Sequence, residues 1–116
     1  DIYYENVLDK NISKKVIKMM TAVVNNGTGK KAKLDKYSVA GKTGTVRMNI
    51  KGKYKKNNHL ALFVGIVPSV HPEYVAAIII RNPRNGPAAG GKNAAPIFKE
   101  FMNHSLNLLK VYPDKK

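Results

Sequence analysis

Three side chains within four consecutive residues could together bind an anion. They are the ammonium of Lys42 and the hydroxyls of Thr43 and Thr45, within the segment V-A-G-K-T-G-T-V. Its small apolar residues predict a strand, and glycine within a strand is typical of a bulge or of a close approach by another backbone or a ligand. A lysine in a partly buried strand supplies a fixed positive charge and can help to move a proton. The segment therefore predicts one wall of an active site that binds a carboxylate substrate.

The backbone of this segment could take part as well. Gly44 carries no side chain, so a substrate backbone could lie flat against the strand edge. The main-chain N–H at Thr45 could donate to an oxyanion, and Arg47 could line the same site. The alternative is a bulge with an exposed lysine. A phosphate-binding P-loop does not fit, because it requires a glycine where the sequence has Lys36 and a helix directly after Thr43.

Composition limits the class of protein. The 116 residues suffice for one modest domain or a piece of a larger one, and 43% of them are hydrophobic. The sequence shows neither an apolar run near ~18 residues nor a secretory leader. Cysteine is absent, and no histidine has a second ligand at metal spacing, so we expect neither a metal site nor a cofactor.

The strongest bulk feature is positive charge. The chain has 21 Lys and Arg against 7 Asp and Glu, a formal net charge of +14. Such a balance raises the possibility of a basic nucleic-acid-binding α+β module, which would bind in a salt-dependent way. The basic residues between Lys30 and Lys56 lie mostly in polar, glycine-containing segments, where Tyr37 and Tyr54 are the only aromatic residues. Solvated loop lysines are therefore the preferred interpretation, attraction to an anionic polymer or a membrane surface is the second, and nucleic acid is an unlikely partner.

Hydrophobic periodicity predicts five elements in a single unit over residues 1–116, one modest domain or a piece of a larger one. The connections between the predicted strands are too short for parallel crossovers, so the strands should form an antiparallel meander. The last two strands are almost continuously apolar, which predicts burial on both faces and a sheet covered by helices on both sides, an α+β fold. The elements are a helix over about 12–25, strands over about 37–48, 59–67 and 74–81, and a helix over about 94–110.

Capping and turn residues predict where these elements begin and end. Asn11 or Ser13 could cap the first helix, and Gly27 suits the left-handed position after its end. Asn93 could cap the last helix, with Pro96 in its first turn. We further expect a polar turn over residues 49–58, a frayed tail over 114–116 and two apolar helix stripes: Ile12, Val16, Met19 and Val23, and Phe98, Phe101, Met102, Ser105, Leu108 and Leu109.

Longer segments resemble a known family. V-A-G-K-T-G-T-V, H-L-A-L-F-V-G-I-V-P, E-Y-V-A-A-I-I-I-R-N-P and G-G-K-N-A-A-P-I-F-K-E-F-M are similar to the C-terminal end of class B penicillin-binding proteins, over about residues 12–114. K-T-G is the third motif of that serine acyl-transferase set, after S-x-x-K and S-x-N. The ending G-G-x-x-A-A-P-I-F followed by V-Y-P-D resembles the septal, cell-division type more than the elongation type.

The resemblance implies a peptidoglycan D,D-transpeptidase that cross-links stem peptides through a serine acyl-enzyme and is acylated by β-lactams. Lys42 would polarise the site and assist proton transfer, while Thr43 and Thr45 would hold the carboxylate of the substrate or antibiotic. Gly44 would permit close approach, and the backbone of Thr45 would contribute to the oxyanion hole. Divisome proteins would be partners, at the periplasmic face of the bacterial inner membrane.

One departure from the family pattern is decisive. No serine is followed by a lysine three residues later, and S-x-N occurs only as Ser105-Leu106-Asn107, after K-T-G and inside a predicted helix, so we attribute it to chance. We therefore expect the nucleophile, its base and the membrane anchor in an upstream part of the same polypeptide. Without that part, the strand at 74–81 would have an open edge and the chain would self-associate. A β-lactamase or β-lactam sensor fragment, and an interaction domain that keeps only the fold, remain alternatives.

Overall fold

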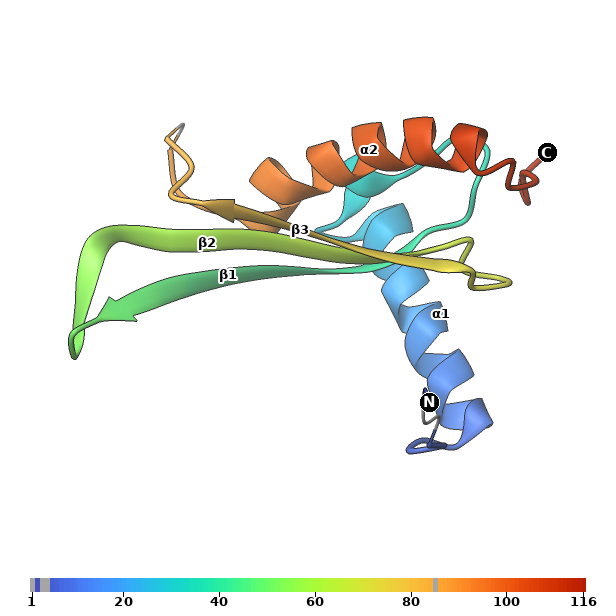
Figure 1. Cartoon of the computed structure of the whole chain (residues 1–116), viewed down its shortest axis with the longest axis horizontal. Helices are drawn as coiled ribbons and strands as arrows, with labels where there is room; N and C mark the ends of the chain where they lie inside the picture. Colours follow the sequence, from blue (N-terminus) through green and yellow to red (C-terminus); the bar gives the residue numbers. More distant parts are fainter. Residues whose placement is uncertain (1, 3–4, 85) are drawn as a thin grey trace.

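The computed structural model describes residue 2, residues 5–84 and residues 86–116. Its helices and strands follow the predicted order, which confirms the α+β fold (Figure 1). A 3₁₀ turn at Lys30–Ala32 precedes the sheet, and a π-helical turn at Gly90–Ala94 leads into the last helix. The main elements are α1 at Lys10–Asn26, β1 at Ala40–Ile50, β2 at Lys53–Val67, β3 at Tyr74–Arg81 and α2 at Ala95–Leu108.

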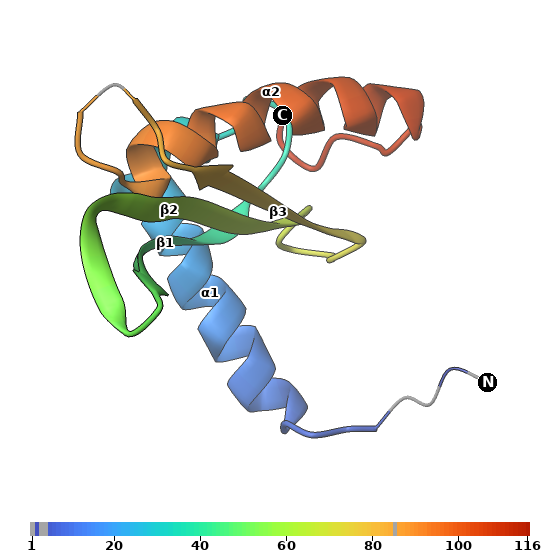
Figure 2. The ribbon, with the colours of Figure 1, turned by 60° about the vertical axis from the view of Figure 1, so that its left-hand side comes forward.

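The three strands form an antiparallel sheet in the order β1-β2-β3, which confirms the predicted meander. β2 is the central strand, with Phe63 paired to Thr43 of β1 on one side and to Ile78 of β3 on the other. In Figures 1 and 2, α2 lies along one side of the sheet and the N-terminal half of α1 runs away on the other side. The β1–β2 hairpin extends well beyond β3 (Figure 1).

The expected polar turn over residues 49–58 is wrong, because both strands continue through it. The reversal is confined to Lys51 and Gly52, which have φ angles of 52° and 76°. Positive φ at both central residues is the geometry that matches the right-handed twist of hairpin strands. A hairpin that projects from the sheet can be built from polar strands, so the polar sequence of this segment did not indicate a loop.

The core lies between α2 and the face of the sheet that carries Phe63. The rings of Phe63 and Phe98 meet edge to face, with their centroids 4.9 Å apart. α1 contributes Val24 to this core, and Leu34 and Leu106 are also fully buried there. Burial of such side chains is the main stabilising contribution in a small domain.

The opposite face of the sheet is covered less completely. Over residues 60–67, β2 alternates half-buried and buried residues, and β3 alternates half-buried and exposed ones. On β3, Val75 is 69% exposed and Ile79 is 62% exposed. The expectation of two strands buried on both faces is therefore wrong for β3, since no described element of the chain packs fully against that face.

α1 differs from the sequence prediction at both ends and along its apolar stripe. Its N-cap is Asp9, whose carboxylate accepts a hydrogen bond from the Asn11 amide at 2.8 Å. Gly27 is extended rather than left-handed, with φ of −110°. Val24 is the only residue of this helix that is fully buried, whereas three members of the predicted stripe are exposed: Ile12, Val16 and Met19.

α2 begins differently from the prediction as well. Ala94 is its N-cap without a side-chain bond, and Asn93 instead accepts a hydrogen bond from the Ala89 amide at 2.9 Å. Pro96 does lie in the first turn. The buried stripe follows spacings of three and four residues, through Ala95, Phe98, Met102 and Leu106, whereas Phe101, Leu108 and Leu109 are exposed.

The expected frayed tail is bonded to the segment that precedes β1. The Asp114 carboxylate accepts hydrogen bonds from the amide of Ser38, at 2.7 Å, and from its hydroxyl. The Ser38 hydroxyl in turn accepts from the amides of Ser69 and Val70. Lys115 adds a bond from its ammonium to the Leu34 carbonyl, at 2.9 Å. The tail thus fastens the start of β1 to the β2–β3 turn.

Among the described residues, no helix combines the length and the apolar character that crossing a membrane requires.

We expect the purified chain to self-associate through β3. This strand forms one end of the described sheet and carries exposed apolar side chains, and such edges readily pair with another chain. In sedimentation velocity, Ile79→Lys should shift the protein towards monomer. Leu108→Lys, which replaces an exposed leucine at the end of α2, serves as the matched control. A monodisperse monomer for the unchanged chain would contradict this expectation.

The tail should also contribute measurably to stability. Asp114→Ala removes two hydrogen bonds to Ser38 and should lower the free energy of unfolding by about 1 kcal/mol, since the site is exposed to water. Urea unfolding followed by circular dichroism would measure the loss. The control is Asp35→Ala, at an exposed aspartate between the 3₁₀ turn and β1. Equal stability of the two variants would argue against a role for the tail.

Candidate active site on strand β1

β1 places the lysine and the threonines of K-T-G-T on opposite faces. Lys42 pairs with Val64, whereas Thr43 pairs with Phe63 and shares its face with Thr45. Thr43 is half-buried and Thr45 is exposed. The prediction of a partly buried lysine is wrong, because Lys42 is exposed and its Nζ donates to the Thr43 carbonyl at 2.6 Å. Lys42 and Gly44 thus lie on one face of β1, and Thr43 and Thr45 lie on the other.

The outer edge of β1 has backbone groups available to a ligand. β1 lies at one end of the strand order. Among the described residues, one of its edges pairs with β2 and the outer edge pairs with no strand. The Asn82 amide donates to the His59 carbonyl at 2.8 Å, so the backbone of His59 points to the β3 side and that of Leu62 points to β1. Leu62 pairs with Gly44, and the neighbouring Thr43 carbonyl therefore points to the unpaired edge. Backbone direction alternates along an antiparallel strand, so the N–H and carbonyl of Thr45 point to the same edge. This edge could hold an extended peptide or donate to an oxyanion.

Two glycines after β3 pack directly against the candidate site. A Cβ atom placed on Gly90 would lie 2.1 Å from the Leu62 carbonyl oxygen and 2.8 Å from the Gly44 nitrogen. One placed on Gly91 would lie 2.2 Å from the Thr28 carbonyl oxygen. These contacts explain why the π-helical turn begins with two glycines, and such turns are frequent at functional sites.

The threonine face of β1 borders a basic cavity of about 480 Å³. Thr28, just after α1, contributes a hydroxyl that lies 3.0 Å from the Thr43 hydroxyl. Sequence reasoning missed Thr28, because nothing in the local pattern brings it to a strand 15 residues away. Hydroxyl donors beside ammonium groups favour an anionic ligand. The residues that line this cavity are Thr28, Lys30, Lys31, Thr43, Thr45, Ala89, Gly90, Gly91 and Lys92.

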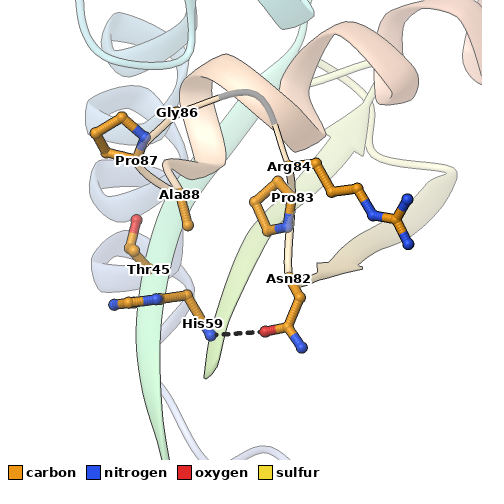
Figure 3. Close-up of a pocket in the computed structure, with 8 residues that line it drawn as sticks. All are labelled: Thr45, His59, Asn82, Pro83, Arg84, Gly86, Pro87 and Ala88. Atoms are coloured by element: carbon orange, nitrogen blue, oxygen red, sulfur yellow. Dashed lines mark hydrogen bonds between the residues drawn. The ribbon is translucent and has the colours of Figure 1, made fainter. Parts of the chain in front are cut away.

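A second cavity of about 610 Å³ meets the first at Thr45 (Figure 3). Its other wall is the loop after β3, held by Asn82, which accepts a hydrogen bond from the His59 amide at 3.0 Å and has a φ of 51°. Arg84 lines this cavity, although its side chain points away from Thr45 in Figure 3. The full lining is Thr45, His59, Asn82, Pro83, Arg84, Gly86, Pro87 and Ala88.

His59 and Arg47 occupy different positions relative to this cavity. His59 would begin the strand predicted over 59–67, but it lies within the longer β2, is half-buried and lines the cavity. Arg47 pairs with His59 across the ladder and is exposed. The cavity is lined without Arg47, so the expectation that this arginine helps to form the site stays a prediction.

The described residues contain no group of three or more His, Cys, Asp or Glu side chains that could hold a metal ion. Ser105, which completes S-x-N by its letters, donates its hydroxyl to the Phe101 carbonyl within α2, at 2.8 Å. This bond gives Ser105 a local partner inside its helix. The chemistry available on β1 is thus anion binding and backbone hydrogen bonding.

Comparison with known proteins gives a consistent result. The family model described as "Penicillin binding protein transpeptidase domain" matches residues 2–103. The chain is 38% identical to "Probable peptidoglycan D,D-transpeptidase PenA" of Neisseria flavescens, over 96% of this chain and 28% of that protein. It is 39% identical to "Peptidoglycan D,D-transpeptidase FtsI" of Buchnera aphidicola subsp. Baizongia pistaciae, over 98% and 20% of the two proteins.

A solved structure agrees with these relatives. The transpeptidase domain of penicillin-binding protein 3 from Burkholderia pseudomallei superposes with a TM-score of 0.85 at 29% identity, over 97% of this chain and 34% of that one. The chain therefore spans only 20–34% of the length of these three proteins.

Proposed function

The chain belongs to the penicillin-binding protein transpeptidase family, and from this premise we propose that it forms the substrate-carboxylate wall of a class B peptidoglycan D,D-transpeptidase. The observation that carries the proposal is the position of the two threonine hydroxyls of K-T-G-T. They share one face of an open-edged strand and border a cavity lined by lysines. A carboxylate bound there would accept from hydroxyls in a positive field.

The proposed reaction is an acyl transfer with two partners. A serine elsewhere in the longer polypeptide attacks the peptide bond between two D-alanines, and the terminal D-alanine leaves as the acyl-enzyme forms. The amine of a neighbouring stem peptide then attacks the ester, which cross-links the stems and releases the serine. A β-lactam acylates the same serine, and its carboxylate takes the place of the one on the terminal D-alanine.

Each residue of K-T-G-T has a distinct role in this proposal. Thr43 and Thr45 donate to the carboxylate, and Gly44 lets the substrate backbone approach the edge. The Thr45 N–H donates to the oxyanion that develops on the attacked carbonyl. Lys42 supplies positive charge and assists proton transfer, for which its flexible ammonium must leave the Thr43 carbonyl. Arg47 is kept as a further candidate for binding substrate.

The septal subtype is the finer part of the proposal. The similarity to an FtsI protein supports a role in cell division, outside the cytoplasm at the bacterial inner membrane, with divisome proteins as partners. A β-lactamase or sensor fragment would share K-T-G, but the Gly90-Gly91 to Pro96 ending favours a penicillin-binding protein. The family match also favours a transpeptidase over a nucleic-acid-binding module.

Labelling with a fluorescent penicillin tests whether the nucleophile lies outside the 116-residue chain. We expect the 116-residue chain alone to remain unlabelled, because it contains no S-x-x-K, whereas the longer polypeptide should be labelled once per molecule. Mass spectrometry of the intact proteins would count the adducts. Stoichiometric labelling of the 116-residue chain would place the nucleophile within it and contradict the proposal that the serine lies elsewhere.

Thr45→Val in the longer polypeptide tests the carboxylate contact. The loss of one hydrogen bond to a charged group should lower the second-order rate of acylation about 10- to 100-fold. Val46→Thr is the matched control, since it adds a hydroxyl at the next position, on the opposite face of β1. A rate for Thr45→Val equal to that of the unchanged protein would remove Thr45 from the proposed site.

A further inference from the structure

We propose that Thr28 is a positioning residue for Thr43, whose hydroxyl proton it directs towards the bound carboxylate. The inference rests on the proposed function and adds to it a residue outside K-T-G-T. Its central observation is the 3.0 Å separation between the hydroxyl oxygens of Thr28 and Thr43. Thr28 lies between the end of α1 and the 3₁₀ turn at Lys30–Ala32, so this bond ties the site strand to a separate segment.

The backbone around Thr28 is held firmly. The amides of Gly27 and Gly29, on either side of it, both donate to the Val23 carbonyl, at 3.0 and 3.1 Å. Gly29 is buried, and a Cβ atom placed on it would lie 3.2 Å from the Phe63 ring. Thr28 is therefore exposed on a loop that is fixed both to its own helix and to the core.

A second contact holds this loop near β1. The Thr28 carbonyl oxygen occupies the space that a side chain at residue 91 would need. A Cβ atom placed on Gly91 would lie 2.2 Å from this oxygen. The same Cβ atom would be 3.6 Å from the Thr43 methyl carbon. Thr28, Thr43 and Gly91 are thus in close mutual packing, and the two hydroxyls meet at the edge of this contact.

The direction of the hydrogen bond decides what Thr43 can do. Each hydroxyl has one proton to donate and two lone pairs. If Thr43 donates to Thr28, its proton is not available to a ligand. If Thr28 donates to Thr43, the Thr43 proton is free for a carboxylate, which only accepts, so a bound carboxylate selects this second direction. Hydrogen bonds in such a chain polarise one another, which strengthens the donation from Thr43.

The rigidity of threonine makes this control effective. A β-branched side chain has few χ1 states, so a partner on one lone pair fixes where the remaining proton can point. Lys30 and Lys31 line the same cavity as Thr28 and Thr43 and bring positive charge to it. An anion drawn there has to select only one of two hydrogen-bond directions, and this limits the entropy lost on binding.

The test compares a β-lactam that carries a free carboxylate with its methyl ester, on the full-length protein. Thr28→Val should lower the acylation rate of the free acid about 3- to 10-fold, as expected for one neutral hydrogen bond, and should lower the ester rate less, because an ester oxygen is a weaker acceptor than a carboxylate. Thr28→Ser keeps the hydroxyl and should restore most of the rate. Thr21→Val is the matched control, since the Thr21 hydroxyl donates to the Ile17 carbonyl within α1, at 2.8 Å.

The outcomes separate the inference from the proposed function. If the unchanged protein is acylated and Thr28→Val reacts at the same rate with the free acid, the inference is wrong and the proposed function stands. An equal loss with acid and ester would show a general structural effect and would also overturn it. If the unchanged full-length protein is not acylated at all, the proposed function fails, and the inference fails with it.

Discussion

The register between β1 and β2 is the constraint on which the rest of the structure depends. Gly41 and Gly65 are directly paired, and each leaves room for an aromatic ring. A Cβ atom on Gly41 would lie 2.3 Å from the Phe63 ring, and one on Gly65 would lie 2.3 Å from the Phe98 ring. A slip of one residue would replace these glycines with side chains and would move every side chain to the other face. The core therefore fixes which face of β1 carries the threonines.

That face of β1 changes in burial along its length, and this gradient makes the site. Gly41 is buried beneath Phe63, Thr43 is half-buried, and Thr45 and Arg47 are exposed. The two hydroxyls thus lie where the core gives way to solvent. A hydroxyl deeper in the core would need an internal partner, and one farther out would be fully hydrated. A position at this boundary leaves hydroxyls fixed by packing and still accessible to a ligand.

The sequence was sufficient for the topology but not for the contacts between distant segments. Apolar strand segments with short connections predicted the antiparallel meander, and K-T-G identified β1 as the strand of interest. Patterns could not reveal that Asp114 bonds to Ser38, or that Thr28 meets Thr43, because both contacts depend on tertiary packing. The hairpin was missed because its strands are polar, and helix caps were misplaced because several polar residues compete for that position.

The two end strands of the sheet, β1 and β3, differ in chemistry. β1 presents Lys42 and the two threonines beside an unpaired backbone edge, a polar surface suited to a charged peptide. The opposite end of the sheet is apolar, with Val75 and Ile79 exposed on β3, and α1 likewise exposes most of its apolar stripe. Such surfaces are unfavourable in water and require a cover. The chain spans only 34% of the Burkholderia transpeptidase domain that it superposes on, so in the proposed transpeptidase other parts of the polypeptide would cover these apolar surfaces and leave the β1 edge open to the proposed substrate.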